Sequence, residues 1–187
     1  MKRSPLSSLF VFSSLIALIL FDLHGVTPGT LEDYCKKIEG PNLTYDFCME
    51  FLQRSGYSKT AVDLKQLAEF AIPIAMDSMG QTRRFIITLW DDLGKKWEEK
   101  TLEFLHSCTD LYDNGSPRAY DAIESLRANN TLEAYVIMNE VFDVPRICED
   151  LFRQWWRQSP MTEANAKCRQ DIRLPLHIVQ MALTGNK

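Results

Sequence analysis

Five cysteines, at positions 35, 48, 108, 148 and 168, restrict this chain more than any other feature of its sequence. A secreted chain would use them for disulfides, whereas a reducing compartment would keep them as thiols. No CxxC or HxxxH spacing accompanies them, so a metal site is the weaker interpretation. The cysteines therefore predict a disulfide framework with one thiol left over and no metal, provided that the chain is secreted.

The beginning of the chain predicts that it is secreted. A basic pair at positions 2 and 3 precedes an apolar run from Leu9 to Phe21, which Asp22 closes. Such a run is typical of a signal peptide, whereas a membrane anchor needs about 20 apolar residues. We expect residues 1–25 to be removed, with cleavage between positions 25 and 29. Residues 30–184 then form one domain without a membrane span.

The charge of the chain argues against nucleic acid as a partner. The formal net charge is −4, and removing residues 1–25 takes away Lys2, Arg3 and Asp22, which leaves −5. Nucleic-acid phosphates attract basic surfaces, so cationic or neutral partners suit this chain better.

Three Asn-X-Ser/Thr triplets fit a secretory route. They begin at Asn42, Asn114 and Asn129, and Pro117 follows the second triplet closely. We predict Asn42 and Asn129 as N-glycosylation sites, with Asn114 the least favourable of the three.

From residue 60 onward, apolar side chains recur every three or four residues, which predicts long amphipathic helices. Pairs typical of helix starts are Thr60 with Asp63, Asn130 with Glu133 and Ser159 with Pro160. Pro73 lies inside the first helix and predicts a kink there. Because short connections make neighbouring helices antiparallel, we expect an all-α fold containing an up-down-up-down four-helix bundle.

These helices predict which cysteines pair. Residues 31–56 indicate two short helical pieces, and a Cys35–Cys48 bridge would stabilise such a hairpin by about 3 kcal/mol in the chain-entropy model. Cys108 and Cys148 stand 21 residues before and 19 after Asn129. At 1.5 Å per residue both lie about 30 Å from that turn, on facing helices, so they pair. Cys168 remains as a buried, inert thiol on an apolar helix face.

No motif for catalysis occurs in the chain. GxSxG, GxxxxGK, HExxH and GxGxxG are all missing, and neither His106 nor His177 has a recognisable partner. We expect a protein that is not an enzyme and needs no cofactor.

Two adjacent tryptophans could form a binding surface. Helical geometry that turns Trp155 inward with Phe152 turns Trp156 outward, beside Arg157. An exposed Trp beside Arg is typical of binding hot spots, so Trp156 and Arg157 are candidate contacts. Alternatively, both rings fill the end of the bundle against the hairpin.

Six segments resemble the signature stretches of plant invertase and pectin methylesterase inhibitors, in the same order. They are Tyr34–Lys37, Tyr45–Cys48, Thr60–Ala68, Cys108–Tyr112, Cys148–Phe152 and Ser159–Thr162. The sequences of these segments are most similar to those of the invertase inhibitors, which include pollen allergens. The resemblance implies a helical hairpin on a four-helix bundle, the same two disulfides, and an extracellular or apoplastic location, with the vacuole as an alternative.

The resemblance also implies a function and a partner. The partner would be a carbohydrate-active enzyme, in the first place an acid invertase (β-fructofuranosidase). Inhibition of a pectin methylesterase and a non-inhibitory extracellular binding role on the same scaffold are the alternatives.

One segment departs from the family. The invertase inhibitors insert a Pro-Lys-Phe turn into the target's cleft, and the equivalent positions here are Thr131, Leu132 and Glu133. The cation and the ring are missing, and Glu133 would face the paired carboxylates of a glycosidase cleft. A glycan on Asn129 would lie at the same turn. We therefore expect these three residues to bind an invertase weakly.

Overall fold

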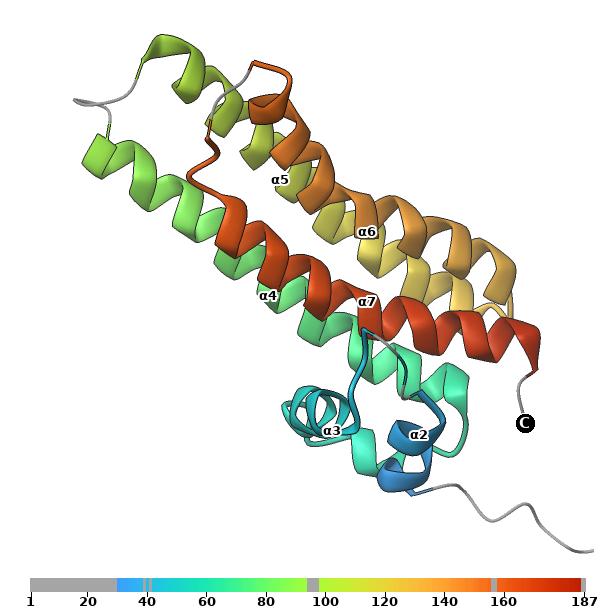
Figure 1. The fold of residues 1–187 in the computed structure, drawn as a ribbon. Coiled ribbons are helices and arrows are strands. Elements are labelled where there is room, and N and C mark those ends of the chain that lie inside the picture. The colour runs from blue at the N-terminus through green and yellow to red at the C-terminus, as the bar shows by residue number, and fades with distance from the viewer. Residues whose placement is uncertain (1–29, 39, 41, 94–97, 156–157, 186–187) are drawn as a thin grey trace, which may run out of the picture.

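The computed structural model describes residues 30–38, 40, 42–93, 98–155 and 158–185, and within these ranges it is all-helical (Figure 1). The predicted signal peptide and both residues of the Trp156–Arg157 pair lie outside the described residues. Among the helices that are described, none is both long and apolar enough to cross a membrane.

Four long helices form an antiparallel bundle, as predicted. They are α4 (Leu64–Leu93), α5 (Glu99–Arg127), α6 (Thr131–Arg153) and α7 (Thr162–Thr184). Each helix packs on two others: α4 contacts α5 and α7, and α6 also contacts α5 and α7. Figure 1 shows the four rods side by side, with the α5–α6 turn and the C-terminal end of α7 at the same end of the bundle.

The first bundle helix begins later than the sequence predicts. Thr60 ends a short 3-10 helix, η1 (Ser58–Thr60), and its hydroxyl donates to the carbonyl of Tyr57. Asp63 is the cap instead, because its carboxylate accepts the Gln66 backbone N–H at 2.8 Å. The Gln66 side chain in turn accepts the Val62 N–H at 2.9 Å, so the reciprocal pair starts three residues downstream. The helix is continuous across Pro73.

Of the other two predicted helix starts, the structure confirms one and corrects the other. Asn130 caps α6 as expected, because its side-chain oxygen accepts the backbone N–H of Glu133 at 3.3 Å. Ser159 does not open α7, which begins at Thr162. Its hydroxyl donates to Glu149 at 2.8 Å and accepts the Met161 N–H, so it holds the connection rather than capping the helix.

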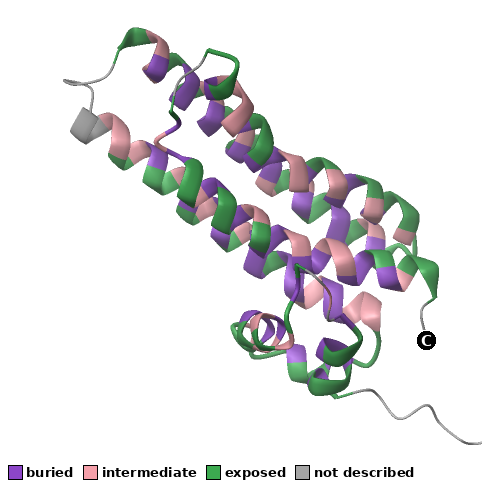
Figure 2. Ribbon diagram, viewed as in Figure 1, coloured by how far each residue is buried: buried purple, intermediate pink, exposed green. Residues whose placement is uncertain are grey.

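One side of each bundle helix is buried, and these sides face one another (Figure 2). The helices approach most closely around Gly115 of α5. A Cβ added there would lie 2.5 Å from the Met79 side chain of α4 and 3.2 Å from Val144 of α6. Gly115 therefore permits a close three-helix contact, and a larger residue there would require Met79 and Val144 to shift.

The N-terminal hairpin is small by comparison. It consists of α2 (Leu31–Ile38) and α3 (Tyr45–Gln53), and α3 and η1 pack on α4. Cys35 and Cys48 are joined as predicted, with their Cα atoms 5.6 Å apart. A second link reaches the bundle: Arg54 donates to the buried carboxylate of Asp171 on α7 at 3.3 Å. The hairpin is thus held by one disulfide, its packing and one ion pair.

Candidate functional site

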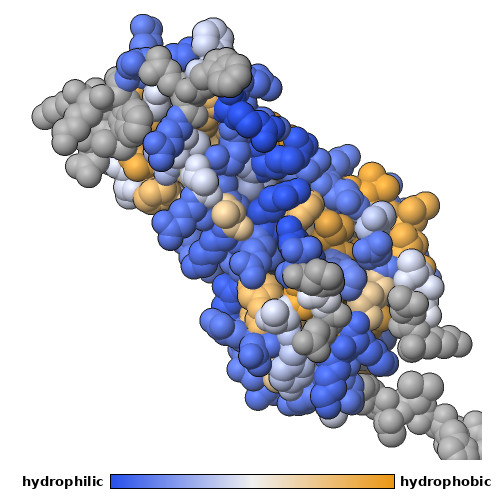
Figure 3. All heavy atoms as spheres, in the orientation of Figure 1, coloured by the Kyte–Doolittle hydropathy of each residue, from blue (hydrophilic) through white to orange (hydrophobic). Residues whose placement is uncertain are grey.

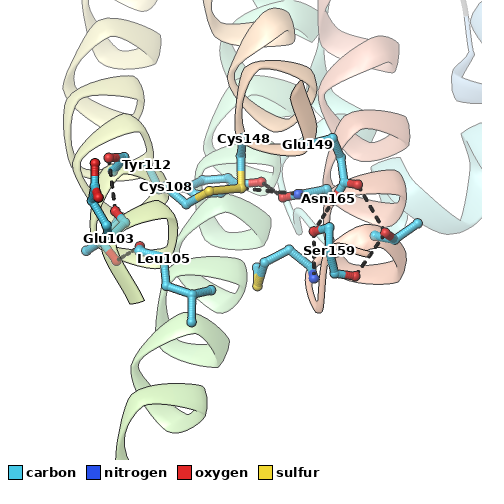
Figure 4. Close-up of a disulfide and its surroundings, with 12 residues drawn as sticks. Glu103, Leu105, Cys108, Tyr112, Cys148, Glu149, Ser159 and Asn165 are labelled. Carbon is cyan, nitrogen blue, oxygen red and sulfur yellow. Dashed lines mark hydrogen bonds between the residues drawn. A yellow bond between two sulfur atoms is a disulfide. The ribbon is translucent and has the colours of Figure 1, made fainter. Parts of the chain in front are cut away.

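The second disulfide lies in the middle of a buried polar network. Cys108 and Cys148 are joined, as predicted, with Cα atoms 5.1 Å apart. Figure 4 shows Asn165 of α7 beside this bridge. The Asn165 amide donates to the Cys148 sulfur at 3.3 Å and to Glu149 at 2.7 Å, and its oxygen accepts the Tyr112 hydroxyl at 2.6 Å. These contacts tie α5, α6 and α7 together.

The remaining thiol is buried, as expected. Cys168 has no exposed surface and no disulfide partner. Burial raises its pKa to about 11, and hydrogen bonds with Thr82 and Ser78 only partly oppose this. Because the thiolate is the reactive form, this cysteine is inert at neutral pH.

Two histidines, His106 and His177, lie among the described residues, and they lie on different helices. The exposed His106 stacks on Trp90 of α4 with ring centroids 4.1 Å apart. His177 is half-buried on α7. Within the described ranges, no group of three or more His, Cys, Asp or Glu side chains is arranged to hold a metal ion.

The strongest candidate contact site is the turn between α5 and α6. Asn129 adopts a left-handed backbone conformation with φ of 62°, which Asn tolerates better than most residues. Its side-chain oxygen accepts a hydrogen bond from Lys65 at the start of α4. Thr131, Leu132 and Glu133 are therefore not the turn itself. They form the first turn of α6, directly after it.

Ion pairs hold this end of the bundle in place. Arg127 at the end of α5 reaches Glu69 of α4 at 3.2 Å and Glu124 at 2.8 Å. Glu133 is exposed and makes no ion pair with any described residue. The first turn of α6 is thus a supported surface with one uncommitted carboxylate.

Apolar side chains are exposed on the same surface. Leu132 is 60% exposed, and Val136, four residues later on the same face of α6, is 45% exposed. Leu183, near the end of α7, is also exposed. Figure 3 shows apolar side chains gathered where α6 begins and α7 ends. Such a patch suits a protein partner more than a small molecule.

The structure corrects the interpretation of the tryptophan pair. Phe152 is buried as expected, but Trp155 is 57% exposed, so it does not turn inward. The reason is that α6 ends at Arg153 and the chain continues as a tighter turn, in which the Trp155 N–H donates to the Phe152 carbonyl at 3.1 Å. Trp155 instead lies near Phe104, with the Lys100 ammonium 5.0 Å from its ring centroid.

Thr131 and Trp155 are not brought together. They lie at opposite ends of α6, whose 23 residues extend over about 35 Å. A single flat interface would have to run along the whole helix to include both.

The three predicted glycosylation positions are all exposed, in different surroundings. Asn42 lies in the connection between α2 and α3, and Asn129 lies at the α5–α6 turn. Asn114 lies in the middle of α5 and is followed by the closely packed Gly115.

Sequence reasoning missed the contacts that shape the α5–α6 turn. Nothing in the local pattern indicated that Lys65 and Asn129 would meet, because 64 residues separate them. Two arginines on α7, Arg169 and Arg173, were also missed. Their spacing of four residues was a usable signal, because like charges at that distance repel on a helix.

The fold and its bridges define a class of protein: a disulfide-bonded four-helix bundle that carries a disulfide-linked helical hairpin. The sequence profile described as plant invertase/pectin methylesterase inhibitor matches residues 29–176. The chain belongs to this family.

Individual relatives agree with this assignment. A protein of Platanus acerifolia named "Putative invertase inhibitor" is 28% identical over 97% of this chain and 98% of its own length. "Pectinesterase inhibitor 12" of Arabidopsis thaliana is 25% identical over 89% of this chain and 98% of its own length. A crystal structure of a mutant pectin methylesterase inhibitor from Arabidopsis superposes with a TM-score of 0.61 at 18% identity, over 82% of this chain and 97% of that one. This last similarity concerns the fold alone.

Proposed function

We propose that this protein is a secreted inhibitor of a plant acid invertase and has no catalytic activity of its own. The observation that carries the proposal is the family match over residues 29–176, combined with relatives from two Platanus species that are both named "Putative invertase inhibitor". These relatives match 97% and 83% of this chain, so the likeness covers the hairpin as well as the bundle.

Secretion is supported by three features of different kinds. The first 25 residues have the pattern of a signal peptide. Two disulfides join four of the five cysteines, which suits an oxidising compartment. Three exposed asparagines stand in glycosylation triplets. We expect the mature protein in the apoplast.

The α5–α6 end of the bundle is the proposed contact surface. Leu132 and Val136 give it exposed apolar area, and the Arg127 ion pairs hold it in place. Glu133 opposes binding to a glycosidase cleft, because two carboxylates there carry the same charge. Trp156 and Arg157 remain proposed contacts as well, at the other end of α6.

The direct test is inhibition of two enzymes by the purified protein. An acid invertase and a pectin methylesterase are each titrated with the inhibitor, and residual activity is measured at each enzyme's working pH. Invertase inhibition without effect on the esterase supports the proposal. Inhibition of the esterase alone would replace it with the second candidate.

Two observations favour that second candidate. The turn lacks the Pro-Lys-Phe sequence that resemblance to the invertase inhibitors leads one to expect, and a full-length relative is named as a pectinesterase inhibitor. Inhibition of neither enzyme would favour a non-inhibitory binding protein.

Restoring the missing turn sharpens the test. The triple substitution Thr131→Pro, Leu132→Lys and Glu133→Phe should strengthen invertase inhibition by about tenfold or more, because it removes a repulsive charge and adds a cation. The fold should tolerate it, since position 131 is the first residue of α6, where proline is favoured. The Glu133 N–H that Asn130 accepts belongs to the backbone and is kept.

The triple variant also destroys the glycosylation triplet at Asn129, so it needs a matched control. Asn129→Gly removes the same triplet, keeps the left-handed conformation and leaves residues 131–133 unchanged. If Asn129→Gly alone strengthens inhibition as much as the triple substitution, the glycan and not the turn sequence was the obstacle. If neither variant inhibits better than the parent, this surface does not contact the invertase.

A further inference from the structure

A pocket lies between the hairpin and the bundle, away from the α5–α6 turn. Its volume is about 490 Å³, within the range of small-molecule sites. It is lined by Asn42, Thr44, Ala166, Arg169, Gln170 and Arg173. Figure 1 shows the connection between α2 and α3 rising to meet α7 at this place.

Two arginines give the pocket its chemistry. Arg169 and Arg173 stand four residues apart on α7, so their side chains share one face of the helix. Both lie over the ring of Phe142 on α6, with the guanidinium carbons 4.1 Å and 5.6 Å from its centroid. A ring that contacts both cations restricts where they can go. The pair is therefore positioned before any ligand arrives.

Neither arginine is neutralised by a described carboxylate. Among the described residues, no ion pair involves Arg169 or Arg173 within 4.0 Å. Asp143 lies within electrostatic range of Arg169 but is bonded to Arg146 at 3.0 Å, and these cations together lower its pKa. The Arg169 Nε is buried and has no hydrogen-bond partner.

An unsatisfied buried N–H of a cation is costly, and two like charges four residues apart on a helix repel. The repulsion between the two arginines would fall if an anion entered the pocket. The other described polar residues of the lining, Asn42, Thr44 and Gln170, offer neutral hydrogen-bonding groups.

From this geometry we propose that the pocket binds a small oxyanion between the Arg169 and Arg173 side chains. Guanidinium groups bind carboxylates and phosphates with paired hydrogen bonds. The ligand is thus either the carboxylate of an acidic sugar or an inorganic anion such as phosphate. This site is separate from the proposed inhibitory surface, so either proposal can fail without the other.

Calorimetric titration of the full-length mature protein tests the proposal. The protein is produced both with and without N-glycans, because Asn42 lines the pocket and is a predicted glycosylation site. The probes are a trimer of galacturonic acid, inorganic phosphate and, as a neutral control, a trimer of glucose. We expect binding of at least one anionic probe, weakening as salt is added, and no binding of the neutral trimer. If the galacturonic acid trimer binds more tightly than phosphate, the ligand of the pocket is the carboxylate of an acidic sugar. If phosphate binds more tightly, the ligand is an inorganic anion.

Variants locate the site. Arg169→Gln and Arg173→Gln should each weaken anion binding about tenfold, because each removes one charge-assisted contact. Lys167→Gln removes one positive charge from the same helix at an exposed position outside the pocket, and it should change binding less than twofold. Arg173→Lys keeps the positive charge and is the conservative variant in case a glutamine variant fails to fold. It should weaken anion binding, but by less than Arg173→Gln does.

Two results would overturn the proposal. One is the absence of binding by either anion at millimolar concentration and low salt. The other is an equal loss in Lys167→Gln and the arginine variants, since binding would then reflect general charge and not this pocket.

Discussion

The bundle and the hairpin each contain one disulfide, but they depend on it differently. The bundle helices contain 30, 29, 23 and 23 residues, whereas the hairpin helices contain 8 and 9. Helices shorter than about 12 residues are marginal in water when isolated. The bundle can therefore form around its own core, and the hairpin needs covalent help.

The position of each bridge shows the same contrast. Cys108–Cys148 lies inside a packed interior beside Tyr112 and Asn165, where many other contacts hold the same helices together. Cys35–Cys48 joins two short helices, of which α3 makes the more extensive contact with α4. One disulfide thus reinforces the middle of the core, while the other joins two short helices at its margin.

Removing the bundle disulfide should have the largest effect. In the chain-entropy model, a bridge across 40 residues contributes about 4 kcal/mol to the free energy of unfolding. The double variant Cys108→Ala and Cys148→Ala should lose that amount in urea unfolding and keep its helical circular dichroism. Fluorescence and dichroism should report the same transition. A variant that is already unfolded in buffer would show that the bundle, too, depends on its bridge.

Removing the hairpin disulfide should cost less and act locally. A bridge across 13 residues contributes about 3 kcal/mol in the same model. In the double variant Cys35→Ala and Cys48→Ala, hydrogen exchange should speed up in α2 and α3 and stay slow in α4 to α7. Equal loss of protection in all helices would mean that the two parts unfold as one unit.

Alkaline pH should weaken the bundle through Cys168. Its pKa is raised from 9.0 to about 11 in the folded protein, so the unfolded chain loses its proton first. The stability is complete below pH 9 and falls as pH rises towards 11, by about 2 to 3 kcal/mol. The pKa of Tyr112 is raised as well, which adds to the loss above pH 10.

The check is the free energy of unfolding from pH 8 to 11 for the parent and for Cys168→Ala. The variant should show a shallower decline between pH 9 and 11, whatever its stability at pH 8. Identical slopes would show that the thiol does not control this dependence.

The smallest expected effects are those of single glycine substitutions. Gly115 in the bundle is compared with Gly56, which follows the hairpin. Gly115→Ala places a methyl group 2.5 Å from the Met79 side chain, and overpacking of this kind should cost about 1 kcal/mol after Met79 shifts. At Gly56, after the hairpin, nothing lies within 4 Å of an added Cβ, so Gly56→Ala should change stability by less than about 0.5 kcal/mol.

Gly80→Ala is the helical control for this pair. Its added Cβ meets only the Arg84 side chain, at an ordinary 3.5 Å. Alanine favours the helix by up to about 1 kcal/mol over glycine, so thermal unfolding should move upward. A gain in stability at Gly115 as well would show that α4, α5 and α6 are packed less tightly there than the structure indicates.

Much of this architecture could be predicted because it depends on local pattern and chain length. Apolar spacing located the bundle helices, Asn130 marked the start of α6, and distances from Asn129 paired Cys108 with Cys148. The errors concern helix ends. Thr60 and Asp63 are both good caps, and only the reciprocal contact between Asp63 and Gln66 decided which one starts α4. Trp155 was misplaced because the sequence does not show that α6 ends at Arg153.

The sequence by itself determined the helical class, the two disulfides, the buried thiol and the likeness to the inhibitor family, because periodicity, loop length and motifs are properties of neighbouring residues. Only the tertiary structure decided which distant side chains meet. Lys65 reaches Asn129, Arg54 reaches Asp171, and Arg169 and Arg173 share the ring of Phe142 beside the hairpin. These contacts join residues 27 to 117 positions apart, and their geometry follows from how the helices pack, which no local pattern encodes.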